Sequence, residues 1–196
     1  MYKRQALKTA LQATRPNGST HSYDLDAVRL GESATRTTSY TVPADACPTT
    51  YTTSGTASFT SFAGFAGQAS GQAQTQVLDI QPPTLSVSAT PDRLWPPNHK
   101  MKDIALAIDV HDNCDPNPAV RLISVTSSEP DNGLGDGDTA DDIQGAALDT
   151  DDRAIQVRAE RAGGGAGRVY TIRYRATDFS GNATEATTTV TVPHNP

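Results

Sequence analysis

Alternating apolar and polar residues in the second half of the chain limit its possible folds more than any other feature. Residues 101–110 and 168–177 show this alternation most clearly. Successive side chains of a β-strand point to opposite faces, so each segment predicts a strand with one buried face. The residues expected on these buried faces are Ile104, Leu106, Ile108, Val110, Tyr170, Ile172, Tyr174 and Ala176.

Four further segments of the second half also predict strands. They are residues 84–89, 119–126, 153–159 and 184–192, and their expected inward residues are Ile155, Val157, Ala159, Val190 and Val192. No helical pattern separates these segments, and Asp178-Phe179-Ser180-Gly181-Asn182 has the composition of a hairpin turn. Residues 85–196 are therefore predicted to form an antiparallel β-sandwich.

The first half also predicts β structure, but with fewer strands. Candidate strands are residues 22–30, 34–42, 49–62 and 72–80, and residues 6–13 are the one segment compatible with a short helix. Two packed sheets need about seven strands, so residues 1–80 predict an incomplete β domain. Two prolines make residues 81–84 a stiff linker. Residues 1–5 are interpreted as foreign to the native chain.

The stretch from Pro130 to Asp142 concentrates five aspartates and three glycines, with no lysine or arginine. Crowded carboxylates repel one another unless a cation or water screens them. Oxygen ligands on a flexible loop suit Ca²⁺, which accepts about 6–8 oxygens in forgiving geometry. The spacing is not that of an EF-hand. The predicted calcium ligands are Asp131, Asn132, Asp136, Asp138, Asp141 and Asp142; the alternative is a solvated loop that binds nothing.

A second acidic turn contains Asp112 and Asp115, and Asp178 follows a predicted strand. These three carboxylates form a second, weaker candidate cation site. Aspartates also cap turns by accepting hydrogen bonds from nearby backbone N–H groups, and this explains the same residues almost as well.

The composition narrows the functional classes. The net charge is −6 and the pI about 5.1, which argues against nucleic acid and anionic membranes as partners. No run of about 18 apolar residues predicts a membrane-spanning helix. Hydrolase and phosphate-binding motifs are absent, so we expect no enzymatic activity. The sequence leaves three states open for Cys47 and Cys114: a disulfide between them, two free thiols, or a disulfide of Cys47 with another partner.

Several motifs resemble those of bacterial extracellular modules. Gly31-Glu32-Ser33, Tyr40-Thr41-Val42-Pro43 and Val77-Leu78-Asp79 resemble the second half of bacterial surface Ig-like repeats. Residues 83–195 resemble Ig-like modules related to hyalin repeats, through Leu94-Trp95-Pro96-Pro97, Asp112-Asn113-Cys114-Asp115-Pro116, Gly135-Asp136-Gly137-Asp138 and Thr177-Asp178-Phe179-Ser180-Gly181-Asn182. The resemblance implies an all-β fold of tandem Ig-like antiparallel β-sandwiches, the first incomplete.

The same resemblance implies a structural role outside the cell. Such modules serve in secreted and surface-attached proteins, in adhesins and beside hydrolases. We therefore expect an extracellular or cell-surface location, with calcium as the cofactor. The expected partners are other copies of the chain, joined by strand exchange, or neighbouring Ig-like domains. The alternative function is a carbohydrate-binding accessory module of a secreted hydrolase. Trp95, the one tryptophan, would then stack on a sugar, although a structural plug is the favoured role.

Overall fold

The computed structural model describes residues 6–14, 19–29, 33, 35–37, 39, 41–60, 64–133 and 139–195, without the side chains of residues 6–11 and 24–29. The described residues are all-β: they form three antiparallel sheets and no helix. None of them therefore builds a helix with the length and apolar character needed to cross a membrane. The chain divides into two units, Met1–Asp79 (unit 1) and Ile80–Pro196 (unit 2).

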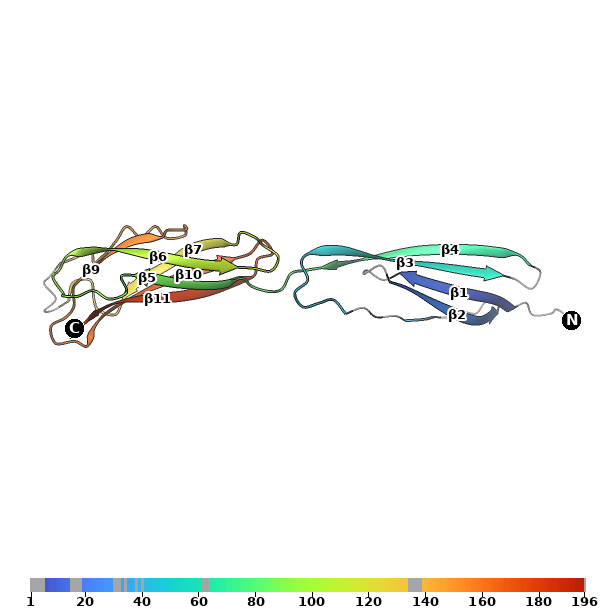
Figure 1. The fold of residues 1–196 in the computed structure, drawn as a ribbon, viewed down its shortest axis with the longest axis horizontal. Helices are drawn as coiled ribbons and strands as arrows, with labels where there is room; N and C mark the ends of the chain where they lie inside the picture. The colour runs from blue at the N-terminus through green and yellow to red at the C-terminus, as the bar shows by residue number, and fades with distance from the viewer. Residues whose placement is uncertain are drawn as a thin grey trace. The chain divides into compact units, whose positions relative to one another are not determined.

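Unit 1 contains a single four-stranded sheet among its described residues (Figure 1). Its strands, in the spatial order β2-β1-β3-β4, are β2 (Thr20–Arg29), β1 (Ala6–Thr14), β3 (Thr49–Thr60) and β4 (Ala66–Val77). Every neighbouring pair is antiparallel. Among the described side chains of this unit, Val77 is the one buried apolar residue.

The structure corrects three expectations for unit 1. Residues 6–13 belong to strand β1 and not to a short helix, because pairing with β2 and β3 satisfies their backbone groups. The described residues of segment 34–42 lie outside any strand. Strand β4 begins at Ala66, earlier than expected, and continues through Gly67 and Gly71.

Gly67 lies where the ring of Phe59 crosses the sheet. The two residues are directly opposite in the β3–β4 pair. A Cβ atom added at Gly67 would lie 2.3 Å from Phe59 Cζ. A side chain at position 67 would therefore displace the ring, and this explains why a glycine is tolerated within the strand.

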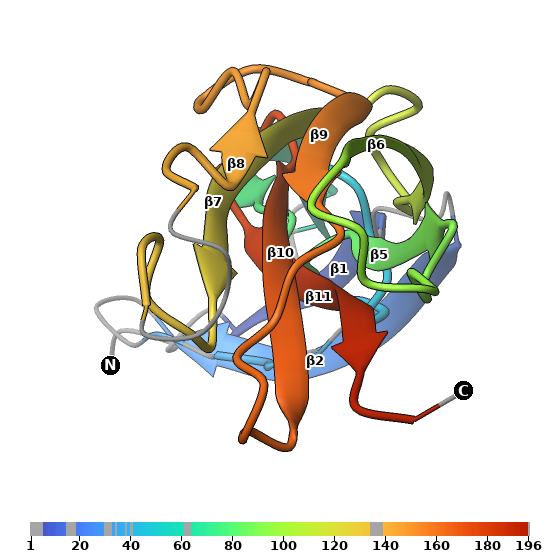
Figure 2. The ribbon, with the colours of Figure 1, turned by 90° about the vertical axis from the view of Figure 1, so that its left-hand side faces the viewer.

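Unit 2 consists of two antiparallel sheets in a sandwich-like arrangement (Figure 2). The first has the order β5-β6-β9-β8, with strands β5 (Thr84–Thr90), β6 (Met101–His111), β9 (Ala154–Arg158) and β8 (Ile143–Gln144). The second has the order β11-β10-β7, with strands β11 (Ala183–Pro193), β10 (Gly167–Thr177) and β7 (Ala119–Ser127). The six strands predicted for this unit correspond to β5, β6, β7, β9, β10 and β11, each to within about one residue at either end, and the two-residue β8 was missed.

The core of unit 2 lies between these two sheets and confirms the alternation seen in the sequence. Its buried members include the predicted inward residues Ile104, Leu106, Ile155, Val157, Ala159, Tyr170, Ile172, Tyr174, Ala176, Val190 and Val192. Ile108 and Val110 are partly buried against the same cluster. Burial of these apolar surfaces is the main stabilising contribution in unit 2.

Two tyrosines complete this core with their hydroxyl groups. Tyr170 donates its hydroxyl to the backbone oxygen of Arg158 at 2.9 Å, and Tyr174 donates to the backbone oxygen of Asp152. Burial raises the pKa of each tyrosine to about 12. Both hydroxyls therefore remain protonated and tie strand β10 to the opposite sheet.

Candidate functional site

The acidic loop between β7 and β8 is closed at its base by Asp131. The Oδ1 atom of Asp131 accepts the backbone N–H of Asp142 at 2.8 Å, and Oδ2 accepts that of Asp141 at 3.0 Å. The bond from Asp142, followed by that from Asp141, lowers the pKa of the Asp131 carboxyl. A single ionised carboxylate thus holds the two ends of the loop together.

Asp142 lies inside the protein at the end of the same loop. Its side chain is 1% exposed. Arg158 donates Nε to Asp142 Oδ1 at 2.9 Å, and Arg168 donates Nη1 to Asp142 Oδ2. Two arginines of the sandwich therefore neutralise this carboxylate directly.

Arg168 is fully buried and its donors are satisfied on several sides. It donates Nε to Glu129 Oε2, Nη2 to the backbone oxygen of Pro130 and Nη1 to the Tyr170 hydroxyl, each at 3.2 Å. Burial works to lower the pKa of the guanidinium, but its hydrogen bonds to Tyr170, Asp142 and Glu129 outweigh burial and raise it. Arg168 is thus a permanent internal cation. We call Arg158, Arg168, Asp142 and Glu129 the arginine clamp.

The predicted calcium ligands are therefore not equivalent. Asp131 and Asp142 come together at the base of the loop, where backbone N–H groups and arginines contact them. Asn132 and Asp141 are exposed nearby. Asp136 and Asp138 lie outside the described residues. Asp131, Asn132 and Asp141 are exposed at the loop base, whereas Asp142 is buried.

Sequence reasoning missed the arginine clamp, although one signal for it was present. Arg168 occupies the same set of alternate positions as Tyr170, Ile172 and Tyr174, so the alternation predicts that its side chain points toward the core. A buried arginine needs an acidic partner. That argument could have paired Arg168 with an aspartate of the acidic loop before any coordinates were known.

The second acidic group joins two turns at one end of unit 2. Asp112 Oδ1 accepts the N–H groups of Cys114 and Asp115 at 2.9 and 2.7 Å. Asp115 accepts the N–H of Asn117 through Oδ1 and that of Phe179 through Oδ2, both at 2.9 Å. The contact with Phe179 connects the β6–β7 turn to the β10–β11 turn. The structure thus brings Asp115 to the turn that Asp178 begins.

Asp178 caps the β10–β11 turn from within. Its Oδ1 accepts the backbone N–H of Asn182 and its Oδ2 accepts the side-chain amide of Asn182, both at 2.8 Å. Burial acts to raise the pKa of Asp178, but the hydrogen bonds from Asn182, Ser180 and Gly181 prevail and lower it. These bonds show turn capping by Asp178, and the cation site at Asp112, Asp115 and Asp178 stays a prediction.

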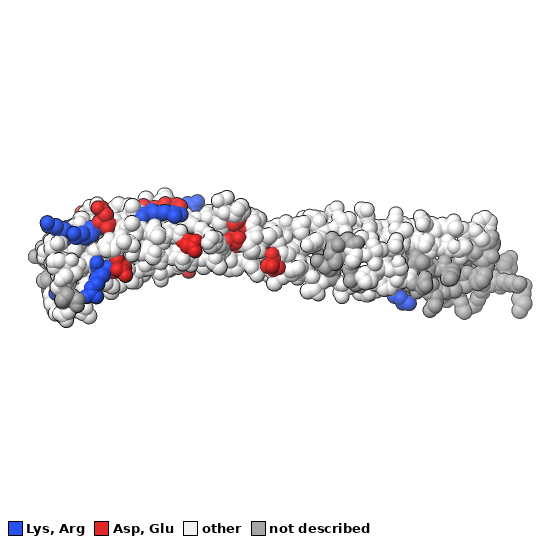
Figure 3. Space-filling view, in the orientation of Figure 1, with Lys and Arg blue, Asp and Glu red and all other residues white. Residues whose placement is uncertain are grey.

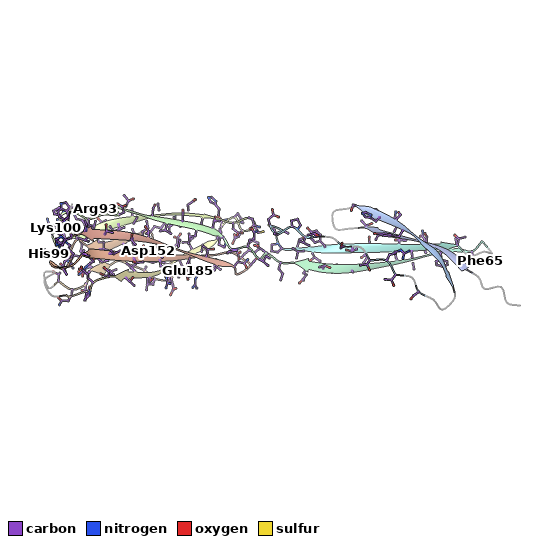
Figure 4. The ribbon with its side chains drawn as sticks, turned by 90° about the horizontal axis from the view of Figure 1, so that it is seen from below. Phe65, Arg93, His99, Lys100, Asp152 and Glu185 are labelled. Atoms are coloured by element: carbon purple, nitrogen blue, oxygen red, sulfur yellow. The ribbon has the colours of Figure 1, made fainter. Side chains whose placement is uncertain are left out.

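A buried carboxylate also lies beside the histidine of the β5–β6 loop. Glu160 is completely buried, and His99 Nδ1 lies 2.8 Å from its Oε2. His99 has a positive φ of 62°, and its backbone N–H donates to the oxygen of Ala159 at 3.0 Å. Arg93, His99 and Lys100 lie at the same end of unit 2 (Figure 4). This pair fixes the loop that carries Trp95.

The cysteines resolve one alternative left by the sequence. Cys47 and Cys114 are both disulfide-bonded, so neither is a free thiol. A disulfide sulfur offers no thiolate to a metal ion. Oxygen ligands therefore remain the basis of the predicted cation sites.

Comparison with known proteins found no match: no protein-family model, curated protein or solved structure corresponds to this chain. The functional inference therefore depends on the residues and contacts of the chain itself.

Replacing Arg168 by methionine should destabilise unit 2 strongly. The substitution leaves Glu129 partly uncompensated and removes one of the two cations bound to buried Asp142. Breaking a buried pair in this way costs about 3–5 kcal/mol. Urea unfolding should show the loss, whereas Arg175→Met, which removes an exposed pair with Glu185, should cost at most about 1 kcal/mol. Equal effects of the two substitutions would contradict the clamp.

The depressed pKa of Asp131 predicts a specific acid dependence. The carboxylate stabilises the fold fully above its ordinary pKa of 3.8, and this contribution is lost as the pH falls through the lower folded value. Asp131→Asn should therefore be less stable than the wild type at neutral pH, and the difference should shrink below about pH 4. Urea midpoints across the pH series measure it. Asp109→Asn on β6 serves as the control, and a gap that widens in acid would refute the assignment.

Proposed function

We propose that this chain is a non-catalytic structural module of a bacterial extracellular protein, built from Ig-like β-sandwich domains and stabilised by calcium. It would serve in a surface protein, an adhesin or a self-assembling fibre. The observation that carries the proposal is the arginine clamp, together with the other buried polar groups of unit 2.

The buried ionisable groups described in unit 2 are engaged in holding loops and strands. Asp142 and Arg168 bind each other, Glu160 binds His99, and Asp115 and Asp178 cap turns. An enzyme typically keeps such groups in a cleft, with perturbed pKa values suited to proton transfer. Groups that fix both ends of a sandwich instead suit a module that must stay rigid under load.

The calcium part of the proposal is supported by the closed base of the acidic loop. Asp131 accepts the backbone N–H groups of Asp141 and Asp142, and Asp136 and Asp138 lie between these residues in the sequence. Arg168 and Arg158 compensate the carboxylate of Asp142, and Arg158 contacts Asp141 through its backbone oxygen at 3.4 Å, not through its carboxylate. We therefore propose Asn132, Asp136, Asp138 and Asp141 as the main ligands, with Asp131 using its remaining lone pairs.

Calcium should raise the melting temperature of the chain, and a chelator should reverse the effect. An ion that binds only the folded state stabilises it by RT ln(1 + [L]/Kd), or about 2.7 kcal/mol at a hundredfold excess over Kd. Differential scanning calorimetry of the wild type and of Asp136→Asn/Asp138→Asn measures the shift. The double variant should lose it.

Asp103→Asn/Asp109→Asn is the matched control, because it removes the same charge from β6 and leaves the loop intact. This variant should keep the calcium response. Identical melting temperatures of the wild type in calcium and in chelator would remove calcium from the proposal. The structural role is tested separately.

A second candidate function is carbohydrate binding, favoured by the exposure of Trp95. Its side chain is 46% exposed, which leaves a ring face available for stacking on a sugar. Tyr170 and Tyr174, however, are buried and cannot extend a binding row. Because Trp95 is the sole tryptophan, its fluorescence should change on adding soluble polysaccharides if this function holds. Unchanged fluorescence across a polysaccharide panel would favour the structural role.

A further inference from the structure

The open edges of the sheets in unit 2 are all short or obstructed. Strand β8 has two residues. Strand β5 has seven and lies between Pro83 and Pro91, which cannot donate to a further strand. These features are the usual protection of a sheet edge against pairing with another chain.

The other two edges of unit 2 are covered by loops. At β7, Leu122 donates its N–H to the oxygen of Thr150 at 2.8 Å and accepts the N–H of Asp149 at 2.9 Å. At β11, Thr191 exchanges backbone hydrogen bonds with Asp92 and Leu94, both at 2.8 Å. Some backbone N–H and C=O groups on the outer edges of β7 and β11 therefore already form hydrogen bonds within the unit.

Strand β4, at one edge of the sheet in unit 1, has none of these protections. It has twelve residues, contains no charged residue and no proline, and pairs with β3 without a register shift. Apart from its pairing with β3, no backbone hydrogen bond within the described residues involves β4. On the face drawn in Figure 3, the atoms of unit 1 that are not grey are mostly uncharged.

The opposite edge of the same sheet provides an internal comparison. Strand β2 carries Asp24, Asp26 and Arg29 among its ten residues. Charges at an edge oppose association with another strand. Unit 1 therefore has one charged edge and one uncharged edge, and only the uncharged edge is suited to pairing.

We propose that β4 is a self-pairing edge, at which two copies of this chain join antiparallel to form one continuous eight-stranded sheet. This inference deepens the proposed structural role, on which it rests, by naming the partner as a second copy of the chain. The two-fold axis of such a pair passes between one residue and its own copy, so the pairing is centred on Gly71 or Gln72 and joins about eleven residues of each strand. It makes about 10–12 backbone hydrogen bonds, because alternate residue pairs exchange two bonds each.

The side-chain pattern of β4 fits this symmetric pairing. One face carries polar side chains: Gln68, Ser70, Gln72, Gln74 and Gln76. The other carries mostly small ones: Gly67, Ala69, Gly71, Ala73 and Thr75. A two-fold axis perpendicular to the sheet keeps each face on its own side, so residues of equal parity lie opposite each other. Amide side chains then meet amide side chains, small residues meet small residues, and no like charges are brought together.

The central test places positive charge on the proposed interface. Sedimentation velocity of the full chain over a wide concentration range should show a reversible dimer for the wild type. Gln72→Lys/Gln74→Lys places two lysines opposite or beside those of the second copy, and should raise the dimer Kd at least tenfold. Thr187→Lys/Thr189→Lys on the exposed face of β11 is the matched control and should leave the Kd unchanged. Circular dichroism checks that each variant keeps its β structure.

A cross-linking experiment tests the same interface without added charge. Ser70→Cys/Gln72→Cys should form a disulfide between copies under mild oxidation, because residue 72 faces its own copy when the pairing is centred on Gln72 and faces residue 70 when it is centred on Gly71. Thr189→Cys, on β11, should cross-link far less. Non-reducing electrophoresis with peptide mapping identifies the bond.

Two results would overturn the inference: a wild type that stays monomeric at every concentration, or a dimer that the lysines in β4 leave intact. Neither would bear on calcium. A monomer that still melts at higher temperature with calcium would reject edge pairing and leave the proposed structural role in place.

Discussion

The ion pair between Arg168 and Asp142 determines how the acidic loop joins the sandwich. Both side chains are almost completely buried, so neither can recover its lost hydration from solvent. Their attraction, with the added bonds to Glu129, Arg158 and Tyr170, compensates that loss only when all partners are in place. The loop therefore has one arrangement at its base. Strands β9 and β10, which carry the two arginines, are fixed to each other through the same carboxylate.

Much of unit 2 could be predicted from its sequence because its strands alternate. Ile104, Ile155 and Ile172 are buried where a period of two places them. Unit 1 was harder to predict, because threonine, serine, alanine and glutamine give little contrast between faces. Residues 6–13 show the consequence: their local pattern allowed a helix, and pairing with β2 and with β3, which lies far along the chain, makes them a strand.

The acidic loop was predicted only in part for a related reason. Its charge density indicated a need for positive counter-charge, and the sequence suggested a metal ion as its source, which stays a prediction. For Asp142 the counter-charge is provided by Arg158 and Arg168, which lie later in the chain. Composition of a segment cannot reveal such a partner, because spatial proximity depends on the pairing of β8 with β9 and on the packing of the sheet that contains β10 against them. Asp131 was similarly included among the ligands, although its two oxygens accept backbone N–H groups that local sequence does not specify.

The position of β1 has a consequence for how unit 1 is formed. Strands β1 and β2 are neighbours in sequence, as are β3 and β4, but the sheet is joined by the distant pairing of β1 with β3. A hairpin of two strands is at best marginally stable in water. During synthesis the first hairpin therefore emerges without the neighbour that stabilises it. Joining the two hairpins requires closure of a long loop, and this is the step expected to limit the folding rate of the unit.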